Sequence, residues 1–256
     1  MVETMTKSLY LLLLLGLAQQ PAAAAEPEKQ DVLVSAAASL KDVMLYSAPL
    51  FEKVNPGFRL VFNFGASGQL KSQIESGAPV DVFISAAASD MDAVERAGLA
   101  VEGTRGVLAN NSLVLVKNSL GKIKIIRTSD LASPEVTRIA IGNPATVPAG
   151  RYARQVLEKR GLYDKLSAKL ILAENVRQVL DYVARGEVDA GFVFLTDAKV
   201  EPKALIAENI PGAEHAPIVY PAAALSNGKN ISGAKKFLKF LSSKKGKAAF
   251  RRFGFN

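Results

Sequence analysis

Four positions where a helix is predicted to begin offer hydrogen-bond donors, either a backbone N–H group or a serine hydroxyl. They are Ser39, Ser67, Ala149 and Val176, the last of which directly follows Asn175. The first N–H groups of a helix have no partner within the helix, and the helix dipole adds partial positive charge there. Each start is therefore a candidate anion site, although ordinary helix capping also explains each one taken alone.

The predicted donors favour one kind of anion. These helix starts offer N–H and O–H groups and almost no side-chain acceptors. A fully ionised tetrahedral dianion needs only donors, whereas protonated phosphate also needs an acceptor. Glu174 and Asp197 lie near the helix starts in the sequence, so phosphate stays open as a ligand. We expect an oxyanion held by neutral hydrogen-bond donors.

The residue types that carry most enzyme chemistry are scarce. The chain has no cysteine and one histidine, His215, which lies in a Pro-flanked loop far from any serine motif. A Ser-His-Asp triad and a zinc site are therefore not expected. The stretch GASGQ lacks the last glycine of a nucleophile elbow, and Leu70 stands where a P-loop needs glycine. We predict no enzyme, no cofactor and no directly ligated metal; the enzyme alternative is a secreted hydrolase that uses Ser39 or Ser67.

Strands must place these helix starts, and the predicted strands alternate with helices. Strands are predicted at residues 31–37, 59–64, 80–84, 113–116, 138–141, 170–172, 188–194 and 218–224. Such alternation predicts an α/β fold built from βαβ units with parallel strands. The carboxyl ends of parallel strands form the ligand crevice of such sheets, so we expect the helix starts to face it.

The first 25 residues are interpreted as a secretory signal that is not part of the fold. Lys7 precedes an apolar run, Leu9 to Ala18, and small residues follow at 22–25. This run is short for a bilayer span, and a membrane anchor is the alternative. Without cysteine the protein has no disulfide and no thioether-linked lipid. We therefore expect a free protein of the periplasm.

The net charge of +8 is concentrated near the end of the sequence. The segment from His215 to Asn256 has nine Lys and Arg and no Asp or Glu. Within it, Ala234, Phe237, Leu238 and Leu241 recur at helical spacing with lysines between them. This pattern predicts an amphipathic helix with a solvated basic face. We expect no nucleic-acid partner.

The chain resembles the periplasmic molybdate-binding proteins of ABC importers over about residues 31–255. The matching motifs are AAASL from Ala36, GASGQL from Gly65, GAPVDVFISA from Gly77, GNPATVPAGRYA from Gly142, ENVRQVL from Glu174 and GFVFLTDA from Gly191. The resemblance implies two α/β lobes, each a mostly parallel sheet flanked by helices, joined by a hinge that the chain crosses twice. We expect lobe one at residues 26–111 and 219–256, and lobe two at residues 112–218.

The resemblance also implies a site between the lobes. Ser39 and Ser67 would donate through hydroxyl and backbone N–H groups, and Ala149 and Val176 through backbone N–H groups alone. Many family members have a tyrosine donor where this chain has Phe194. Another donor or a water is then expected to compensate, or affinity or selectivity differs.

The function that follows is that of a monomeric solute-binding protein. It would capture molybdate, and tungstate, through hydrogen bonds and deliver the ion to the membrane permease of an ABC transporter. The first alternative ligand is sulfate or another tetrahedral oxyanion. An organic carboxylate would require an arginine in the cleft, but Arg151 and Arg177 are predicted to point to solvent, and Tyr152 is predicted to serve helix packing.

Overall fold

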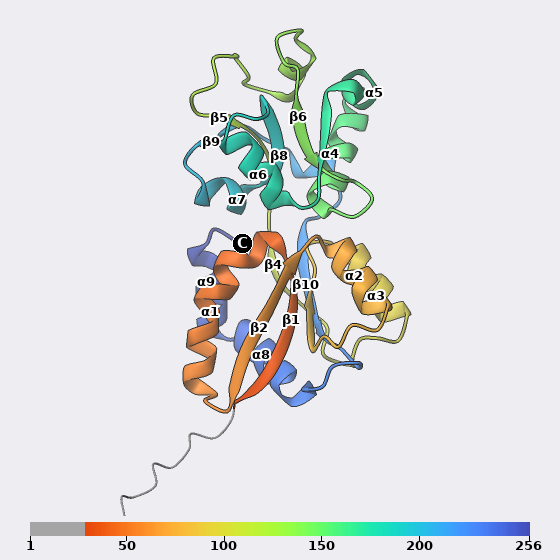
Figure 1. Cartoon of the computed structure of the whole chain (residues 1–256), viewed down its shortest axis with the longest axis vertical. Coiled ribbons are helices and arrows are strands. Elements are labelled where there is room, and N and C mark those ends of the chain that lie inside the picture. Colours follow the sequence, from red (N-terminus) through yellow and green to blue (C-terminus); the bar gives the residue numbers. More distant parts are fainter. Residues whose placement is uncertain (1–28) are drawn as a thin grey trace, which may run out of the picture.

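The computed structural model describes residues 29–256, which form two lobes arranged along the long axis of the molecule (Figure 1). The predicted signal peptide, residues 1–25, lies outside the described residues. Each lobe contains its own five-stranded sheet. No helix within residues 29–256 is long and apolar enough to cross a membrane.

The sheet of lobe one has the strand order β2-β1-β3-β10-β4. Its strands are β1 (Gln30–Ala37), β2 (Phe58–Gly65), β3 (Val82–Ile84), β4 (Gly106–Asn110) and β10 (Val219–Ala224). Strand β1 pairs in parallel with β2 and β3, whereas β10 is antiparallel to β3 and β4. Only β10, which begins at the hinge, therefore runs away from the cleft.

The sheet of lobe two repeats this arrangement with the order β7-β6-β8-β5-β9. Its strands are β5 (Leu113–Asn118), β6 (Ile139–Gly142), β7 (Leu170–Ala173), β8 (Ala190–Phe194) and β9 (Ala204–Asn209). Strand β6 is parallel to β7 and β8, and β5 is antiparallel to β8 and β9. The predicted mostly parallel sheets are confirmed, and the opposed strand in each lobe is the one that starts at the hinge.

Helices flank both sheets (Figure 1). Those of lobe one are α1 (Lys41–Val54), α2 (Ser67–Glu75), α3 (Ala88–Arg96), α8 (Ile231–Ser242) and α9 (Lys244–Arg252). Those of lobe two are α4 (Pro148–Lys159), α5 (Tyr163–Leu166), α6 (Val176–Ala184) and α7 (Leu195–Val200). Short 3-10 turns occur at η1 (Ala38–Leu40), η2 (Thr128–Ala132), η3 (Ser167–Lys169) and η4 (Gly212–Glu214).

Helix α6 shows how local sequence sets an element that reaches the cleft. The Asn175 side chain caps it by accepting hydrogen bonds from the backbone N–H groups of Arg177 and Gln178. Its buried stripe consists of Val176, Val179, Leu180 and Val183. The helix ends before Gly186, which has a φ of 71°. The sequence predicted the Asn175 cap, the buried residues and the end of the helix at Gly186.

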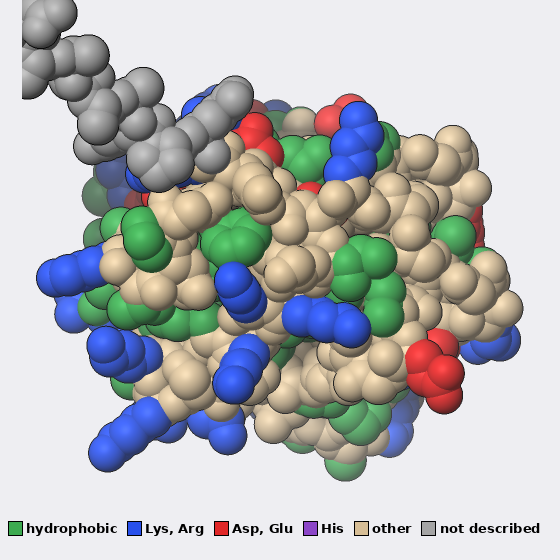
Figure 2. All heavy atoms as spheres, turned by 90° about the horizontal axis from the view of Figure 1, so that it is seen from below, with side chains coloured by type: hydrophobic (Ala, Val, Ile, Leu, Met, Phe, Trp, Pro, Cys, Tyr) green, Lys and Arg blue, Asp and Glu red, His purple; other side chains and the backbone are tan. Residues whose placement is uncertain are grey.

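The C-terminal helices confirm the predicted amphipathic pattern. Phe237 and Leu241 of α8 are buried, while Lys235, Lys236 and Lys239 are exposed. Figure 2 shows the end of lobe one that faces away from lobe two, where Lys and Arg side chains are numerous and Asp and Glu are few. The basic residues therefore form a solvated face on lobe one.

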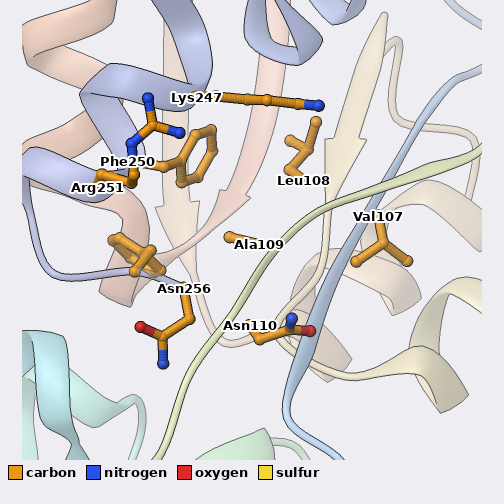
Figure 3. Close-up of a pocket in the computed structure, with 9 residues that line it drawn as sticks. Val107, Leu108, Ala109, Asn110, Lys247, Phe250, Arg251 and Asn256 are labelled. Carbon is orange, nitrogen blue, oxygen red and sulfur yellow. The ribbon is translucent and has the colours of Figure 1, made fainter. Parts of the chain in front are cut away.

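The last residue of the chain pairs with β4. The backbone N–H of Asn110 donates to the carbonyl of Asn256 at 2.8 Å, and the N–H of Asn256 donates back at 3.2 Å. A groove of about 390 Å³ lies beside this pairing, with Lys247 and Arg251 of α9 among its lining residues (Figure 3). This groove is on lobe one and shares no lining residue with the cavity between the lobes.

The chain crosses between the lobes twice, as predicted. The first crossing joins β4 to β5, and the second joins η4 to β10. The two crossings touch, because the N–H of Asn111 donates to the carbonyl of Ile218 at 3.1 Å. The lobe limits at residues 111 and 218 remain a prediction.

Candidate binding site between the lobes

A small cavity lies where the two lobes meet. Its lining residues come from both lobes and are Ala37, Ala38, Gly65, Ala66, Ser67, Val147, Pro148, Ala149, Asn175, Val176 and Phe194. None of these lining residues is charged. The cavity volume of about 10 Å³ is close to that of one water-sized sphere. An ion of several atoms therefore requires the groups that line the cavity to shift.

Ser67 is the first residue of α2 and is fully buried in the wall of this cavity. Its Oγ accepts a hydrogen bond from the backbone N–H of Ala86 at 2.9 Å. Because a backbone N–H can only donate, this bond uses an acceptor site of the hydroxyl and leaves its proton free. Ser67 does not cap α2, since its preceding residue Ala66 occupies the cap position. The hydroxyl is thus available as a donor.

Ser39 lies in the 3-10 turn η1, between the end of β1 and the start of α1. No side chain caps either η1 or α1, so capping does not account for this serine. The side chain is 2% exposed, and its Oγ lies 3.0 Å from the hydroxyl oxygen of Tyr220. Its neighbour Ala38 lines the cavity, which places Ser39 directly behind the wall.

Lobe two contributes backbone donors at two helix starts. Val176 is the first residue of α6, and Ala149 follows Pro148 in the first turn of α4. These N–H groups have no acceptor within their helices. Helix α4 starts very close to the end of β6, because a Cβ at Gly150 would lie 1.8 Å from the carbonyl oxygen of Gly142. Glycine is needed for this close approach.

Phe194 ends β8 and supplies an apolar surface to the cavity. It is 1% exposed, and its ring packs edge-on against Tyr220 with centroids 6.1 Å apart. The centroid of the Tyr152 ring lies 6.3 Å from that of Phe194. The Tyr152 hydroxyl reaches only the carbonyl of Ala86, at 3.4 Å, and that of Pro217, at 3.5 Å. Tyr152 is buried in the packing of α4, as predicted.

The structure adds Tyr220 to the predicted set of residues. It is fully buried in β10, and burial raises the pKa of its hydroxyl above the usual value. Its hydroxyl contacts the side chains of Ser39 and Asn111. The sequence placed this tyrosine in a predicted strand but offered no motif that set it apart. Only the fold, which places β10 beside η1, brings its hydroxyl to Ser39.

The prediction that Arg151 and Arg177 point to solvent is wrong. Arg151 forms an ion pair with Asp90 of α3, in the opposite lobe. Arg177 donates from Nη2 to Asp42 Oδ2 of α1 at 2.6 Å, also across the lobes. Its Nε lies 2.6 Å from Asp197 Oδ1 in its own lobe. Both arginines occupy first turns of helices that face the other lobe, so acidic groups there reach them.

These ion pairs keep the cationic groups from acting as free positive charges in the cleft. Arg177 is shared between two carboxylates, Asp42 and Asp197, and it is mostly buried. Burial raises the pKa of Asp197 to about 6, although the charge of Arg177 opposes the shift. Burial also raises the pKa of Asp90 despite its pairing with Arg151. The groups that line the cavity are therefore uncharged, and the arginines near it are paired with carboxylates.

One backbone contact also joins the two lobes beside the cavity. The N–H of Gly68, in the first turn of α2, donates to the carbonyl of Thr146 at 2.9 Å. A Cβ at Gly68 would lie 2.6 Å from that oxygen. Together with the two arginine contacts, this bond holds the lobes in a closed arrangement.

The structure brings four of the five predicted residues to one cavity and places the fifth behind its wall. The four lining residues are Ser67, Ala149, Val176 and Phe194, and Ser39 is the fifth. Their contact with a ligand stays a prediction. Within residues 29–256 no group of three His, Cys, Asp or Glu is placed to hold a metal ion. The arrangement is suited to hydrogen bonding of a small anion.

Comparisons with known proteins agree with this arrangement. Residues 32–256 match the family described as bacterial extracellular solute-binding protein. The molybdate-binding protein ModA of Haemophilus influenzae is 34% identical, over 100% of this chain and 99% of that protein. ModA of Escherichia coli is 37% identical, over 89% of this chain and 90% of that protein.

A solved structure shows the same architecture. The periplasmic molybdate-binding protein of Azotobacter vinelandii superposes with a TM-score of 0.79 at 29% identity, covering 88% of this chain and 98% of that one. The resemblance found in the sequence motifs is therefore confirmed at the level of the whole chain. The match to residues 32–256 and these identities show that the chain belongs to the bacterial extracellular solute-binding proteins.

Proposed function

We propose that this protein captures molybdate, and also tungstate, between its lobes and delivers the ion to the permease of an ABC transporter. The observation that carries the proposal is the cavity between the lobes, which is lined by helix starts and by no charged residue. Oriented N–H and O–H groups stabilise an oxyanion without a mobile counter-ion. The relatives named for molybdate binding support the choice of ion.

The proposed ligands of the ion come from both lobes. Ser39 and Ser67 donate from lobe one, and the backbone N–H groups of Ala149 and Val176 donate from lobe two. Because the ion bridges the lobes, it favours the closed arrangement, which the permease would recognise. We propose that the protein works as an exported monomer in the periplasm.

A second candidate ligand is sulfate or another tetrahedral oxyanion. The donor set suits any fully ionised tetrahedral dianion, so selection between molybdate and sulfate must come from size. The cavity of about 10 Å³ does not by itself favour the larger ion. Competition between the ions decides between these candidates.

The first test is calorimetry and thermal shift on the protein without residues 1–25, with molybdate, tungstate, sulfate and phosphate. A ligand at about 1,000 times its dissociation constant stabilises the folded state by about 4 kcal/mol. We expect molybdate and tungstate alone to raise the melting temperature. An equal shift with sulfate would favour the second candidate, and no shift with any ion would contradict both.

A matched pair of serine variants tests the site itself. Ser67→Ala removes a hydroxyl from the cavity wall, and a hydrogen bond to a charged group contributes about 1.5–3 kcal/mol, so molybdate should bind about 10-fold to 100-fold more weakly. The control is Ser72→Ala, one turn further along α2, whose hydroxyl donates to the carbonyl of Gly68. Equal affinity of the two variants in calorimetry would place the ion elsewhere.

Delivery to a permease requires a measurement in cells. We expect uptake of labelled molybdate in a strain that carries the transporter to depend on this protein. Complementation by the wild-type chain but not by Ser67→Ala would link uptake to the cavity. Uptake that is the same with and without the protein would contradict the proposal of delivery.

A further inference from the structure

Tyr220 has a buried hydroxyl in contact with a predicted ligand residue. The residue is 0% exposed, and it is not among the residues that line the cavity. Its hydroxyl oxygen lies 3.0 Å from Ser39 Oγ and 3.1 Å from Asn111 Nδ2. The directions of these two hydrogen bonds decide which proton Ser39 can offer to an anion.

The orientation of the Asn111 amide is fixed by its own neighbours. The backbone N–H of Ser112 donates to Asn111 Oδ1 at 2.9 Å, which identifies the oxygen end of the amide. The nitrogen end then faces Tyr220 and also Thr196 Oγ1, at 2.8 Å. Asn111 Nδ2 can only donate, so Tyr220 must accept from it.

The Tyr220 proton has one available acceptor. Among the hydrogen-bond partners that residues 29–256 provide, only Ser39 Oγ can accept it. Ser39 could offer its own proton to a bound anion, but Tyr220 has no second acceptor in the described part of the chain, so both protons are paired in the liganded protein only if Tyr220 donates to Ser39. Asn111 therefore donates to Tyr220, and Tyr220 donates to Ser39; we call these two hydrogen bonds the relay. The Ser39 proton is left for a group outside this relay.

We propose that Tyr220 is a positioning residue that orients the Ser39 hydroxyl as a donor toward the oxyanion. The inference rests on the proposed function. Tyr220 acts through Ser39 and does not touch the ion. Its ring also packs against Phe194 at 6.1 Å, which fixes the position of the hydroxyl.

The hydroxyl of Ser67 also accepts a hydrogen bond from the protein, but its donor is a backbone N–H group. Ser67 Oγ accepts from the backbone N–H of Ala86, which can only donate. Both serines thus accept a hydrogen bond from the protein and keep a proton for the ligand. A backbone N–H group provides the donor for Ser67, whereas the donor for Ser39 is the Tyr220 side chain, which Asn111 orients.

The relay is assembled at the hinge. Asn111 lies in the first crossing, between β4 and β5, and Tyr220 lies just after the second crossing. Thr196, the other partner of the Asn111 amide, belongs to α7 of lobe two. Asn111, Tyr220 and Thr196 therefore set the direction of the Ser39 hydroxyl without lining the cavity themselves.

A double-mutant cycle tests this role. Molybdate affinity is measured by calorimetry for the wild-type protein, Tyr220→Phe, Ser39→Ala and the double variant. We expect Tyr220→Phe to weaken binding about 10-fold, and we expect no further loss when it is added to Ser39→Ala. The same 10-fold loss in both backgrounds would mean that Tyr220 acts independently of Ser39, which would overturn the inference. Wild-type affinity in Tyr220→Phe would also overturn it.

Two further variants keep the test decisive. Tyr182→Phe removes a half-buried tyrosine hydroxyl from α6 and should leave affinity unchanged. If Tyr220→Phe does not fold, Asn111→Ala replaces it in the cycle, because it removes the donor that sets the direction of the relay. Failure of the wild-type protein to bind molybdate, tungstate or sulfate would instead overturn the proposed function together with the inference. Binding by the wild-type protein with no effect of Tyr220→Phe would overturn the inference alone.

Discussion

At the scale of single residues, the cavity is a set of donors surrounded by apolar side chains. Ser67 and Phe194 stand in its wall, and the charges nearby are paired with one another outside it. An oxyanion that enters meets N–H and O–H groups in a site of low polarity, where such bonds are stronger than in water. The addition or loss of a single donor should therefore change the affinity for the anion strongly.

Phe194→Tyr restores the hydroxyl that many members of the family carry at this position. A hydrogen bond to a charged group contributes about 1.5–3 kcal/mol, so we expect molybdate to bind at least about 10-fold more tightly. Phe253→Tyr, which adds a hydroxyl to a half-buried ring on lobe one, is the control. Weaker binding by Phe194→Tyr, measured by calorimetry, would show that the cavity has no room for the added oxygen.

At the scale of elements, the start of α2 meets the loop before α4 across the cleft. Gly68 and Thr146 approach so closely that a single methyl group would prevent the contact. The same helix starts that provide donors also form the surface on which the lobes close. Closure and ligand binding thus depend on one set of backbone positions.

Gly68→Ala tests this coupling. The added Cβ would lie 2.6 Å from the Thr146 carbonyl oxygen, so the lobes cannot close fully, and overpacking costs about 1–3 kcal/mol. We expect molybdate to bind about 10-fold or more weakly, while the melting temperature without ligand stays unchanged because alanine favours the helix.

The control is Gly57→Ala, where a Cβ would meet nothing within 4 Å. Small-angle scattering with saturating molybdate should show a more open form for Gly68→Ala than for Gly57→Ala. Identical affinities and scattering profiles would mean that this contact does not limit closure.

At the scale of the whole molecule, the buried carboxyl of Asp197 links stability to pH. Asp197 is fully buried, and its pKa is raised from 3.8 to about 6. Between about pH 4 and pH 6 the folded protein keeps a proton that the unfolded chain releases. The contribution of this group to stability is therefore complete below about pH 4 and is lost as pH rises through about 6.

The measurement is the melting temperature from pH 4 to pH 7 for the wild-type protein and Asp197→Asn. We expect the wild-type protein to lose on the order of 3 kcal/mol relative to the variant as pH rises through this window. Asp164→Asn, at an exposed position, should retain the wild-type profile. Parallel profiles of the wild-type protein and Asp197→Asn would contradict a raised pKa at this site.

The sequence by itself determined most of the local structure and the chemistry of the helix starts. The Asn175 cap, Pro148 in the first turn of α4 and the buried stripe of α6 were all predicted, because neighbouring residues determine them. Motifs spread along the chain identified the family. The donor character of the site was also predicted, because it depends on residue types and not on partners.

Strands β4 and β9 were missed, although β2 and β7, which also lie at sheet edges, were predicted. Both lie at an edge of their sheets, where alternate residues face solvent and the apolar pattern is weak. In strand β9 the apolar residues Leu205 and Ile206 are exposed to solvent, so apolar residues do not mark a buried face there. The pairing of β4 with β10 and of β9 with β5 identifies them as strands, and the sequence does not contain that pairing.

Only the tertiary structure decided which polar groups are partners. Ser39 and Tyr220 are 181 residues apart in the sequence, and Arg177 is 135 residues from Asp42. The arginines were expected in solvent because they lie just beyond the predicted donor positions. Closure of the lobes brings Asp90 to Arg151 and Asp42 to Arg177, whereas the fold of lobe one alone brings Tyr220 to Ser39. Such pairings depend on the distances between elements, so they follow from the fold and not from local sequence.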